Sequence, residues 1–194
     1  MKPVTALGIV GSARKSGNTS RLVDQILAGA SAAGAETDKL FLIDQQIKPC
    51  LGCPCYVQKP KRTCVQDDDL LAIGARMEKA KLIVVSTPIY WYGPSGLFKN
   101  FLDRWIGLPK SVFEDTYVAA ALTMQDVTPE TAGPTREMLE RSFSGGRWVT
   151  YAGDLLVSGL HHTPNAIEGR KDLLDQGFAY GESLMNRILN SANS

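Results

Sequence analysis

The stretch VTALGIVGSARKSGNTSRLVDQILAGA, residues 4–30, changes its apolar pattern along its length. Its first part, 4–10, is almost continuously apolar, which is typical of a strand covered on both faces. After a polar loop, apolar residues recur at helical spacing: Leu22, Val23, Ile26, Leu27 and Ala30. A strand, a loop and an amphipathic helix in this order predict the first unit of a parallel α/β sheet.

The same alternation continues along the chain. A second apolar run, KLIVVS at 81–86, predicts another buried strand, and weaker strand patterns lie near 36–42, 116–123 and 147–151. Further helices are predicted near 97–105, over 68–79 with Asp67–Asp69 as its N-cap and first turn, and over 166–189. The segment 125–147 suits either a short helix or a flap. The pattern predicts an α/β fold, a three-layer sandwich around a five-stranded parallel sheet, in one domain over residues 1–194.

Composition excludes several classes of protein. Apolar residues make up 44% and charged residues 21%, as in ordinary globular domains. The net charge of +1 supplies no field for nucleic acid or an anionic membrane, so neither is expected as a partner. The apolar run near the N-terminus spans about seven residues, too short for a signal peptide or a membrane span. We therefore expect a cytoplasmic protein.

The loop at 11–22, GSARKSGNTSRL, is dense in hydroxyl and amide groups and leads directly into a helix. Helix N-terminal N–H groups favour an anion, and Ser12, Ser16, Asn18, Thr19 and Ser20 add neutral donors while Arg14 and Lys15 add charge. The loop has neither the triphosphatase nor the dinucleotide glycine pattern, so it favours a terminal phosphate. The alternative is plain turn and cap chemistry.

Aromatic residues follow the strand at 81–86. The segment 86–105, STPIYWYGPSGLFKNFLDRW, carries Tyr90, Trp91 and Tyr92 where a ligand crevice opens in such sheets. These rings could hold a planar ligand, or they could cover the core or a subunit interface. His161 and His162 are interpreted as loop residues, with a place at the cofactor mouth as an option.

Every cysteine lies in KPCLGCPCYVQKPKRTCVQDDD, residues 48–69. Short-range clusters of cysteine in a reducing compartment favour ligands or redox thiols over structural disulfides. The spacing C-x2-C-x-C-x8-C leaves an iron-sulfur cluster, zinc, redox thiols and a loop without metal all open.

In this order, GSARKSGNTSRL, TPIYWYGPSGLFKNFLDR and the cysteines followed by DDD resemble the flavodoxin-like NAD(P)H-dependent FMN reductases, most of all their iron-sulfur flavoprotein branch. The resemblance implies that FMN phosphate is held by Ser12, Arg14, Ser16, Asn18, Thr19 and Ser20. It implies that the flavin ring is flanked by Pro88, Ile89, Tyr90, Trp91, Tyr92 and Gly93, with Thr123 and Met124 as a third loop. A [4Fe-4S] cluster would take Cys50, Cys53, Cys55 and Cys64, although Pro54 and the long last gap depart from the compact pattern of the family.

The implied activity is electron transfer from NADPH or NADH through FMN to a quinone, a metal ion or a protein acceptor, by a homodimer or homotetramer. Because the flavin does the chemistry, no catalytic acid or base is predicted. The alternatives are an iron-sulfur flavoprotein that carries electrons between proteins, and a flavin-binding module without turnover. The near-zero net charge favours the enzyme, since carrier flavodoxins steer to partners by a strong acidic field.

Overall fold

The computed structural model describes residues 4–54, 64–144, 149–161 and 163–192. Its parallel strands follow the order β2-β1-β3-β5-β6. They are β1 Thr5–Val10, β2 Glu36–Phe41, β3 Leu82–Tyr90, β5 Tyr117–Thr123 and β6 Thr150–Val157. A two-residue strand, β4 (Gly93–Pro94), pairs antiparallel with the end of β3. Counting the parallel strands alone, this is the 2-1-3-4-5 order of flavodoxin-like sheets, so the predicted fold class is confirmed.

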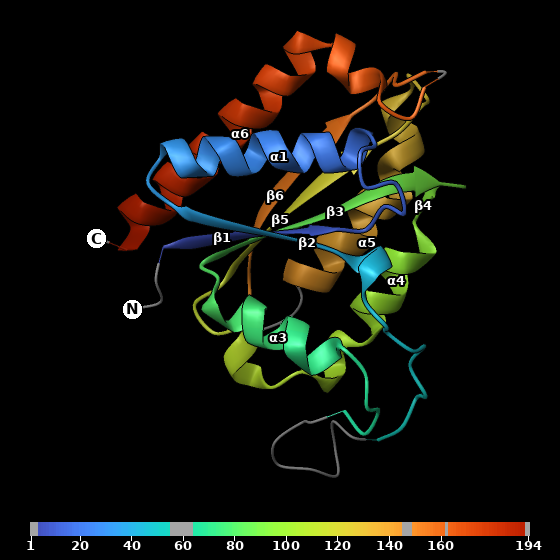
Figure 1. Cartoon of the computed structure of the whole chain (residues 1–194), viewed down its shortest axis with the longest axis vertical. Helices are drawn as coiled ribbons and strands as arrows, with labels where there is room; N and C mark the ends of the chain where they lie inside the picture. Colours follow the sequence, from blue (N-terminus) through green and yellow to red (C-terminus); the bar gives the residue numbers. More distant parts are fainter. Residues whose placement is uncertain (1–3, 55–63, 145–148, 162, 193–194) are drawn as a thin grey trace.

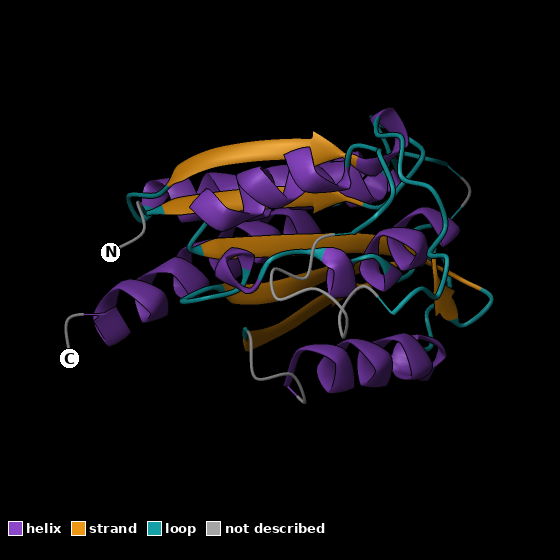
Figure 2. Cartoon of the chain, turned by 90° about the horizontal axis from the view of Figure 1, so that it is seen from below, coloured by secondary structure: helices purple, strands orange, loops and turns teal. Residues whose placement is uncertain are grey.

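Helices cover both faces of the sheet (Figures 1 and 2). Helices α1 (Asn18–Ala32) and α6 (Lys171–Ala192) lie on one face, and α3 (Leu70–Lys79), α4 (Gly96–Asp103) and α5 (Gly133–Ser144) lie on the other. Short 3-10 helices complete the described elements: η1 Leu42–Asp44, η2 Trp105–Gly107, η3 Lys110–Val112, η4 Pro129–Ala132 and η5 Ala166–Gly169. Alternate residues of β1 enter opposite cores, Ala6 and Val10 beneath α1 and α6, Leu7 and Ile9 beneath α3.

Several predicted boundaries were wrong. The strand predicted at 81–86 runs on to Tyr90, because β5 pairs with it through Pro88 and β4 folds back on its last residues. The strand expected near 147–151 is β6 at Thr150–Val157, and the last helix is broken into η5 and α6. The segment 125–147 contains η4 and the helix α5, whose Leu139 and Phe143 are buried in the core.

The acidic run before α3 has a different role from the predicted one. Asp69 occupies the N-cap position but makes no side-chain cap hydrogen bond, and its carboxylate instead accepts from the backbone N–H of Gln46 at 2.7 Å. Asp68 accepts from Leu70 N–H at 3.2 Å, yet its main partner is the guanidinium of Arg104. These carboxylates therefore hold the preceding loop against the helix.

Helices α1 and α6 approach closely enough that backbone touches backbone. A Cβ built on Gly181 would lie 1.9 Å from the carbonyl oxygen of Ile26. We expect Gly181→Ala to lower the free energy of unfolding by about 1–3 kcal/mol, despite the better helix propensity of alanine, because the two helices must separate. Urea unfolding measures this change.

Gly133 of α5 is the control, because a Cβ there meets nothing within 4 Å. Gly133→Ala should leave stability unchanged or raise it slightly. Equal effects of the two substitutions would show that the close packing of α1 on α6 is not what makes glycine necessary at position 181.

In the described part of the chain, no helix combines the length and the apolar character needed to cross a membrane.

Candidate functional site

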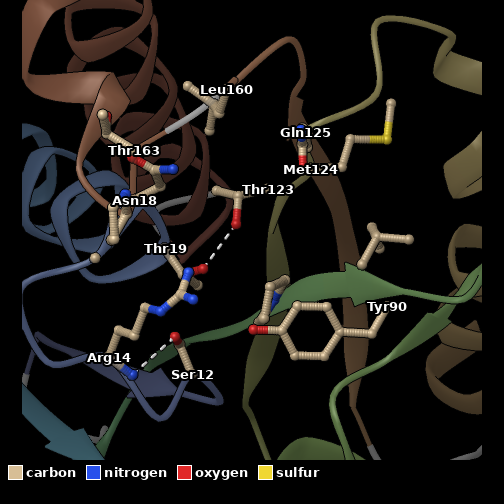
Figure 3. Close-up of a pocket in the computed structure, with 14 residues that line it drawn as sticks. Ser12, Arg14, Asn18, Thr19, Tyr90, Thr123, Met124, Gln125, Leu160 and Thr163 are labelled. Carbon is tan, nitrogen blue, oxygen red and sulfur yellow. Dashed lines mark hydrogen bonds between the residues drawn. The ribbon is translucent and has the colours of Figure 1, made fainter.

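A pocket of about 510 Å³ opens at the carboxyl ends of β1, β3 and β5, the edge where ligands bind in open parallel sheets (Figure 3). Its volume lies within the usual range for cofactor sites, roughly 300–1,000 Å³. Its walls come from the loop after β1, the end of β3, the residues after β5 and the loop before η5. The lining residues are Ser12, Arg14, Gly17, Asn18, Thr19, Pro88, Ile89, Tyr90, Thr123, Met124, Gln125, Leu160, Thr163 and Pro164.

One end of the pocket is polar and is built by the loop after β1. Ser12 is buried, and its hydroxyl oxygen accepts from the backbone N–H of Arg14 at 3.2 Å. Thr19 is also buried and its hydroxyl pairs with that of Thr123 at 2.7 Å. The Arg14 side chain extends toward Thr19 (Figure 3). A cation and two hydroxyls thus gather at the start of α1.

The N-terminus of α1 is suited to an anion. Its N-cap residue is Gly17, which makes no side-chain cap hydrogen bond, and its first turn carries no acidic residue. The N–H groups of a first helical turn lack intrahelical partners, and the helix dipole adds partial positive charge there. The N–H of Asn18 is bonded to the carbonyl of Pro164, and a bound phosphate would satisfy the other donors of this turn in place of a capping side chain.

A third wall of the pocket comes from far along the chain. The backbone N–H of Asn18 donates to the carbonyl of Pro164 at 2.9 Å, and the side-chain oxygen of Asn18 accepts from Ile167 N–H at 3.0 Å. These bonds bring Thr163 and Pro164 to the pocket, and Leu160 is held there by its own N–H, which donates to the carbonyl of Met124 at 3.2 Å. The sequence patterns did not predict these three as site residues. His161, predicted in this loop, is exposed beside them, while His162 lies outside the described residues.

The other end of the pocket is formed by two neighbouring strands. Pro88, Ile89 and Tyr90 line it from the end of β3, and Met124 and Gln125 line it after β5, next to Thr123 at the end of that strand. Figure 3 shows the Tyr90 ring across the pocket from Arg14 and Thr19. Such a mixture of one ring, aliphatic side chains and backbone is suited to the edge and face of a planar group.

The structure separates some predicted site residues from the pocket. Ser20 is buried on another side of α1, where its hydroxyl accepts from Lys39 Nζ at 3.2 Å. The pocket lining also lacks four further predicted residues: Ser16, Trp91, Tyr92 and Gly93.

The aromatic turn between β3 and β4 is exposed and strained. Trp91 and Tyr92 have φ values of 49° and 65°, a left-handed conformation that side chains other than glycine rarely adopt. The Trp91 side chain is 97% exposed. Thr135 of α5 donates to the carbonyl of Tyr92 at 2.9 Å, which holds the turn in place beside the pocket mouth. The backbone therefore presents these rings to solvent and away from the lining.

A buried arginine holds the two ends of the cysteine segment. The side chains of Arg104 and Asp68 are each 1% exposed, and Nη1 of Arg104 lies 2.7 Å from the Asp68 carboxylate. The same guanidinium donates to the carbonyl of Lys48 at 2.5 Å and to the sulfur of Cys64 at 3.1 Å. Burial raises the pKa of Asp68, but hydrogen bonds from Arg104, Lys48 and Leu70 outweigh it and hold this pKa below its ordinary value of 3.8.

The cysteines do not form a visible metal site in the described part of the chain. Cys50 is exposed, Cys53 and Cys64 are half-buried, and Cys55 lies outside the described residues. Among the described residues, no group of three or more His, Cys, Asp or Glu side chains is placed to hold a metal ion. The sulfur of Cys64 instead accepts a hydrogen bond from Arg104.

Sequence comparison finds similar proteins that carry the name iron-sulfur flavoprotein. An iron-sulfur flavoprotein of Archaeoglobus fulgidus is 32% identical over 101 residues, which is 52% of this chain and 45% of that protein. An iron-sulfur flavoprotein of Methanocaldococcus jannaschii is 36% identical over 98 residues, 50% of each chain. The chain thus spans about half the length of the curated relatives that it matches.

The structural and family comparisons cover more of the chain. An NAD(P)H:quinone oxidoreductase from Methanothermobacter marburgensis has a TM-score of 0.74 at 12% identity, over 94% of this chain and 99% of that one, a likeness of fold. The family described as NADPH-dependent FMN reductase matches residues 4–132, more than half of the sequence. The chain therefore belongs to the NADPH-dependent FMN reductase family.

Proposed function

We propose that this chain, as a single flavodoxin-like domain, is an FMN-dependent NAD(P)H oxidoreductase. The observation that carries the proposal is the pocket itself. One end has hydroxyls, a cation and a helix N-terminus without a side-chain cap, and the other has Tyr90 with aliphatic neighbours. A molecule with a terminal phosphate and a planar ring matches both ends. Membership of the FMN reductase family gives independent support.

The residues present fit FMN. Ser12, Arg14 and Thr19 would hold the phosphate together with the first-turn amides of α1. Pro88, Ile89 and Tyr90 would orient one edge of the ring, and Thr123, Met124 and Gln125 the other. Bound FMN would supply the two-electron chemistry, hydride acceptance from a nicotinamide and delivery to an acceptor. The protein's part is to orient the ring and limit the access of water to it.

The acceptor and the assembly belong to the proposal as well. We propose NADPH or NADH as donor, a quinone, metal ion or redox protein as acceptor, and a homodimer or homotetramer as the working form. The test is steady-state oxidation of each nucleotide by the FMN-loaded protein with a quinone, alongside sedimentation to measure the assembly. Absence of turnover with both nucleotides, together with rapid reduction by a ferredoxin, would replace this proposal by that of an electron carrier.

The cysteine segment supports a second candidate function, an iron-sulfur flavoprotein that passes electrons between proteins. Relatives carry the name iron-sulfur flavoprotein. In this chain the guanidinium of Arg104 donates hydrogen bonds to Lys48 and Cys64, which flank the other cysteines in sequence. The candidate ligands of a [4Fe-4S] cluster are Cys50, Cys53, Cys55 and Cys64. Those of them that the structure describes are not placed together to hold a metal ion. No step of the proposed reaction depends on the cluster.

Iron and acid-labile sulfide analysis after anaerobic purification tests the cluster. About four of each per chain, lost in Cys53→Ser, would support it. Flavin absorbance alone, with titratable thiols, would leave an FMN reductase whose cysteine segment is structural.

A further inference from the structure

Ser95 is buried between the two ends of the pocket and does not belong to its lining. Close to it, the paired strands β1 and β3 separate. The N–H of Gly11 donates to the carbonyl of Ser86 at 2.8 Å, one residue beyond the end of β1. From there the first chain segment leads to the polar end of the pocket, while β3 continues to the other end at Tyr90. Ser95 therefore lies where the two halves of the pocket diverge.

The hydroxyl of Ser95 joins the loop after β1 to the start of α4. It donates to the carbonyl of Gly11, and as the N-cap of α4 it accepts from the N–H of Phe98 at 3.2 Å. The packing here is close, since a Cβ built on Gly11 would lie 2.4 Å from the carbonyl oxygen of Ser86 and 2.8 Å from Cβ of Phe98. Gly11 immediately precedes Ser12, so this hydroxyl helps to fix where the polar end of the pocket begins.

The backbone of Ser95 joins the same residue to the other end of the pocket. Its N–H donates to the hydroxyl oxygen of Thr87 at 2.8 Å, and that hydroxyl donates to the carbonyl of Pro88 at 2.9 Å. Thr87 is buried, and Pro88 lines the pocket. A chain of hydrogen bonds thus runs from Gly11 through Ser95 to Pro88.

We propose that Ser95 is a positioning residue, which holds the polar end of the pocket and the end at Tyr90 at the separation that FMN requires. The inference rests on the proposed function, because it assigns these two ends to the phosphate and the ring of FMN. Fixing both ends before the ligand arrives reduces the cost of ordering them on binding. Ser95 acts through Gly11 and Thr87, and not by contact with the flavin.

Riboflavin tests this role, because it has the ring and the ribityl chain of FMN and lacks the phosphate. The ratio of its dissociation constant to that of FMN measures what the phosphate contributes to binding. In Ser95→Ala this ratio should fall about tenfold, comparable to the effect of one hydrogen bond to the charged phosphate. FMN should bind about tenfold more weakly, while the affinity for riboflavin should change by less than about twofold. Flavin fluorescence quenching on titration of the apoproteins measures both constants.

Ser95→Gly separates positioning from a loss of stability. It also lacks the hydroxyl, but glycine is a much better N-cap residue than alanine, so α4 is less weakened. A positioning role predicts the same ratio in both variants despite their different stabilities, and Ser95→Gly carries the test where Ser95→Ala does not fold. Urea unfolding measures the two stabilities.

Thr116→Val is the matched control. Thr116 is buried, and its hydroxyl donates to the carbonyl of Glu114 at 3.2 Å, just before β5 and at the edge of the sheet opposite the pocket. This variant should be less stable than the wild-type chain, with an unchanged ratio of the two dissociation constants.

An unchanged ratio in the Ser95 variants would overturn the inference, as would equal losses of affinity for FMN and riboflavin. A ratio that falls as far in Thr116→Val would also overturn it, because lost stability would then be the cause. These results leave the proposed function intact, since the wild-type chain would still bind FMN more tightly than riboflavin. If the wild-type chain binds the two flavins equally, the polar end does not hold the phosphate, and the inference is wrong together with that assignment.

Discussion

Replacing Arg104 by methionine is expected to lower the free energy of unfolding by about 3–5 kcal/mol, the usual cost of removing one partner of a buried ion pair. The loss follows from burial, because the Asp68 carboxylate would keep its desolvation cost and lose its cation. The free energies of unfolding of ordinary domains are roughly 5–15 kcal/mol, so this loss would be a large share of the total stability. Urea unfolding at neutral pH measures the loss.

Arg141→Met is the matched control. Arg141 is paired with Glu137 at 2.7 Å, the same distance as the buried pair, but its side chain is 80% exposed. Solvent screens such a pair and the entropy of two long side chains opposes it, so stability should hardly change. If both variants lose the same stability, burial is not the cause of the Arg104 effect.

The Arg104 effect should also depend on pH. The pKa of Asp68 in the folded protein lies below 3.8, so the unfolded state binds the proton more readily. The stability from this carboxylate is therefore complete above pH of about 4 and is lost as the pH falls through the folded pKa. The difference in unfolding free energy between wild type and Arg104→Met should shrink over that acid range.

Arg104→Met combined with Asp68→Asn should recover part of the lost stability at neutral pH, because no buried charge remains.

The sequence predicted the fold class because local patterns determine it. The apolar run of β1 and the spacing of Leu22 and Ile26 follow from burial of each element on a neighbour. The polar half of the pocket could be predicted too, since a loop that follows a parallel strand always reaches the same edge of the sheet. The predicted residues Ser12, Arg14, Asn18 and Thr19 do line it.

Other features depend on contacts that no local pattern encodes. Thr163 is next to Pro164, which bonds to Asn18, and Leu160 donates its N–H to the carbonyl of Met124 at 3.2 Å. Both contacts join parts of the chain that are far apart in sequence. Ser20 is separated from Thr19 by the helical turn of about 100° per residue, a rotation that helix periodicity could have revealed. The aromatic turn was predicted as a loop, but its left-handed backbone, which carries the rings out of the lining, is set by pairing of β3 with β4.

FMN affinity is expected to fall by about two to four orders of magnitude when Ser12→Ala and Thr19→Val are combined. Each hydroxyl would donate to the phosphate, and hydrogen bonds to a charged group contribute roughly 1.5–3 kcal/mol each. Asn18 is left unchanged, because its side-chain oxygen accepts from Ile167 N–H. A substitution there would also disturb the pocket wall formed by the loop before η5. Flavin fluorescence quenching on titration of the apoprotein measures the dissociation constant.

Ser16→Ala is the control for this prediction, since Ser16 lies in the same loop and is exposed outside the lining. It should bind FMN as tightly as the wild-type chain. The double variant also loses the Thr19–Thr123 hydrogen bond. Urea unfolding of the flavin-free proteins therefore shows whether weaker FMN binding comes from lost phosphate contacts or from a less stable protein. If the double variant is stably folded and binds FMN as tightly as Ser16→Ala, the phosphate does not lie at the start of α1, and the assignment of this pocket to the flavin is wrong.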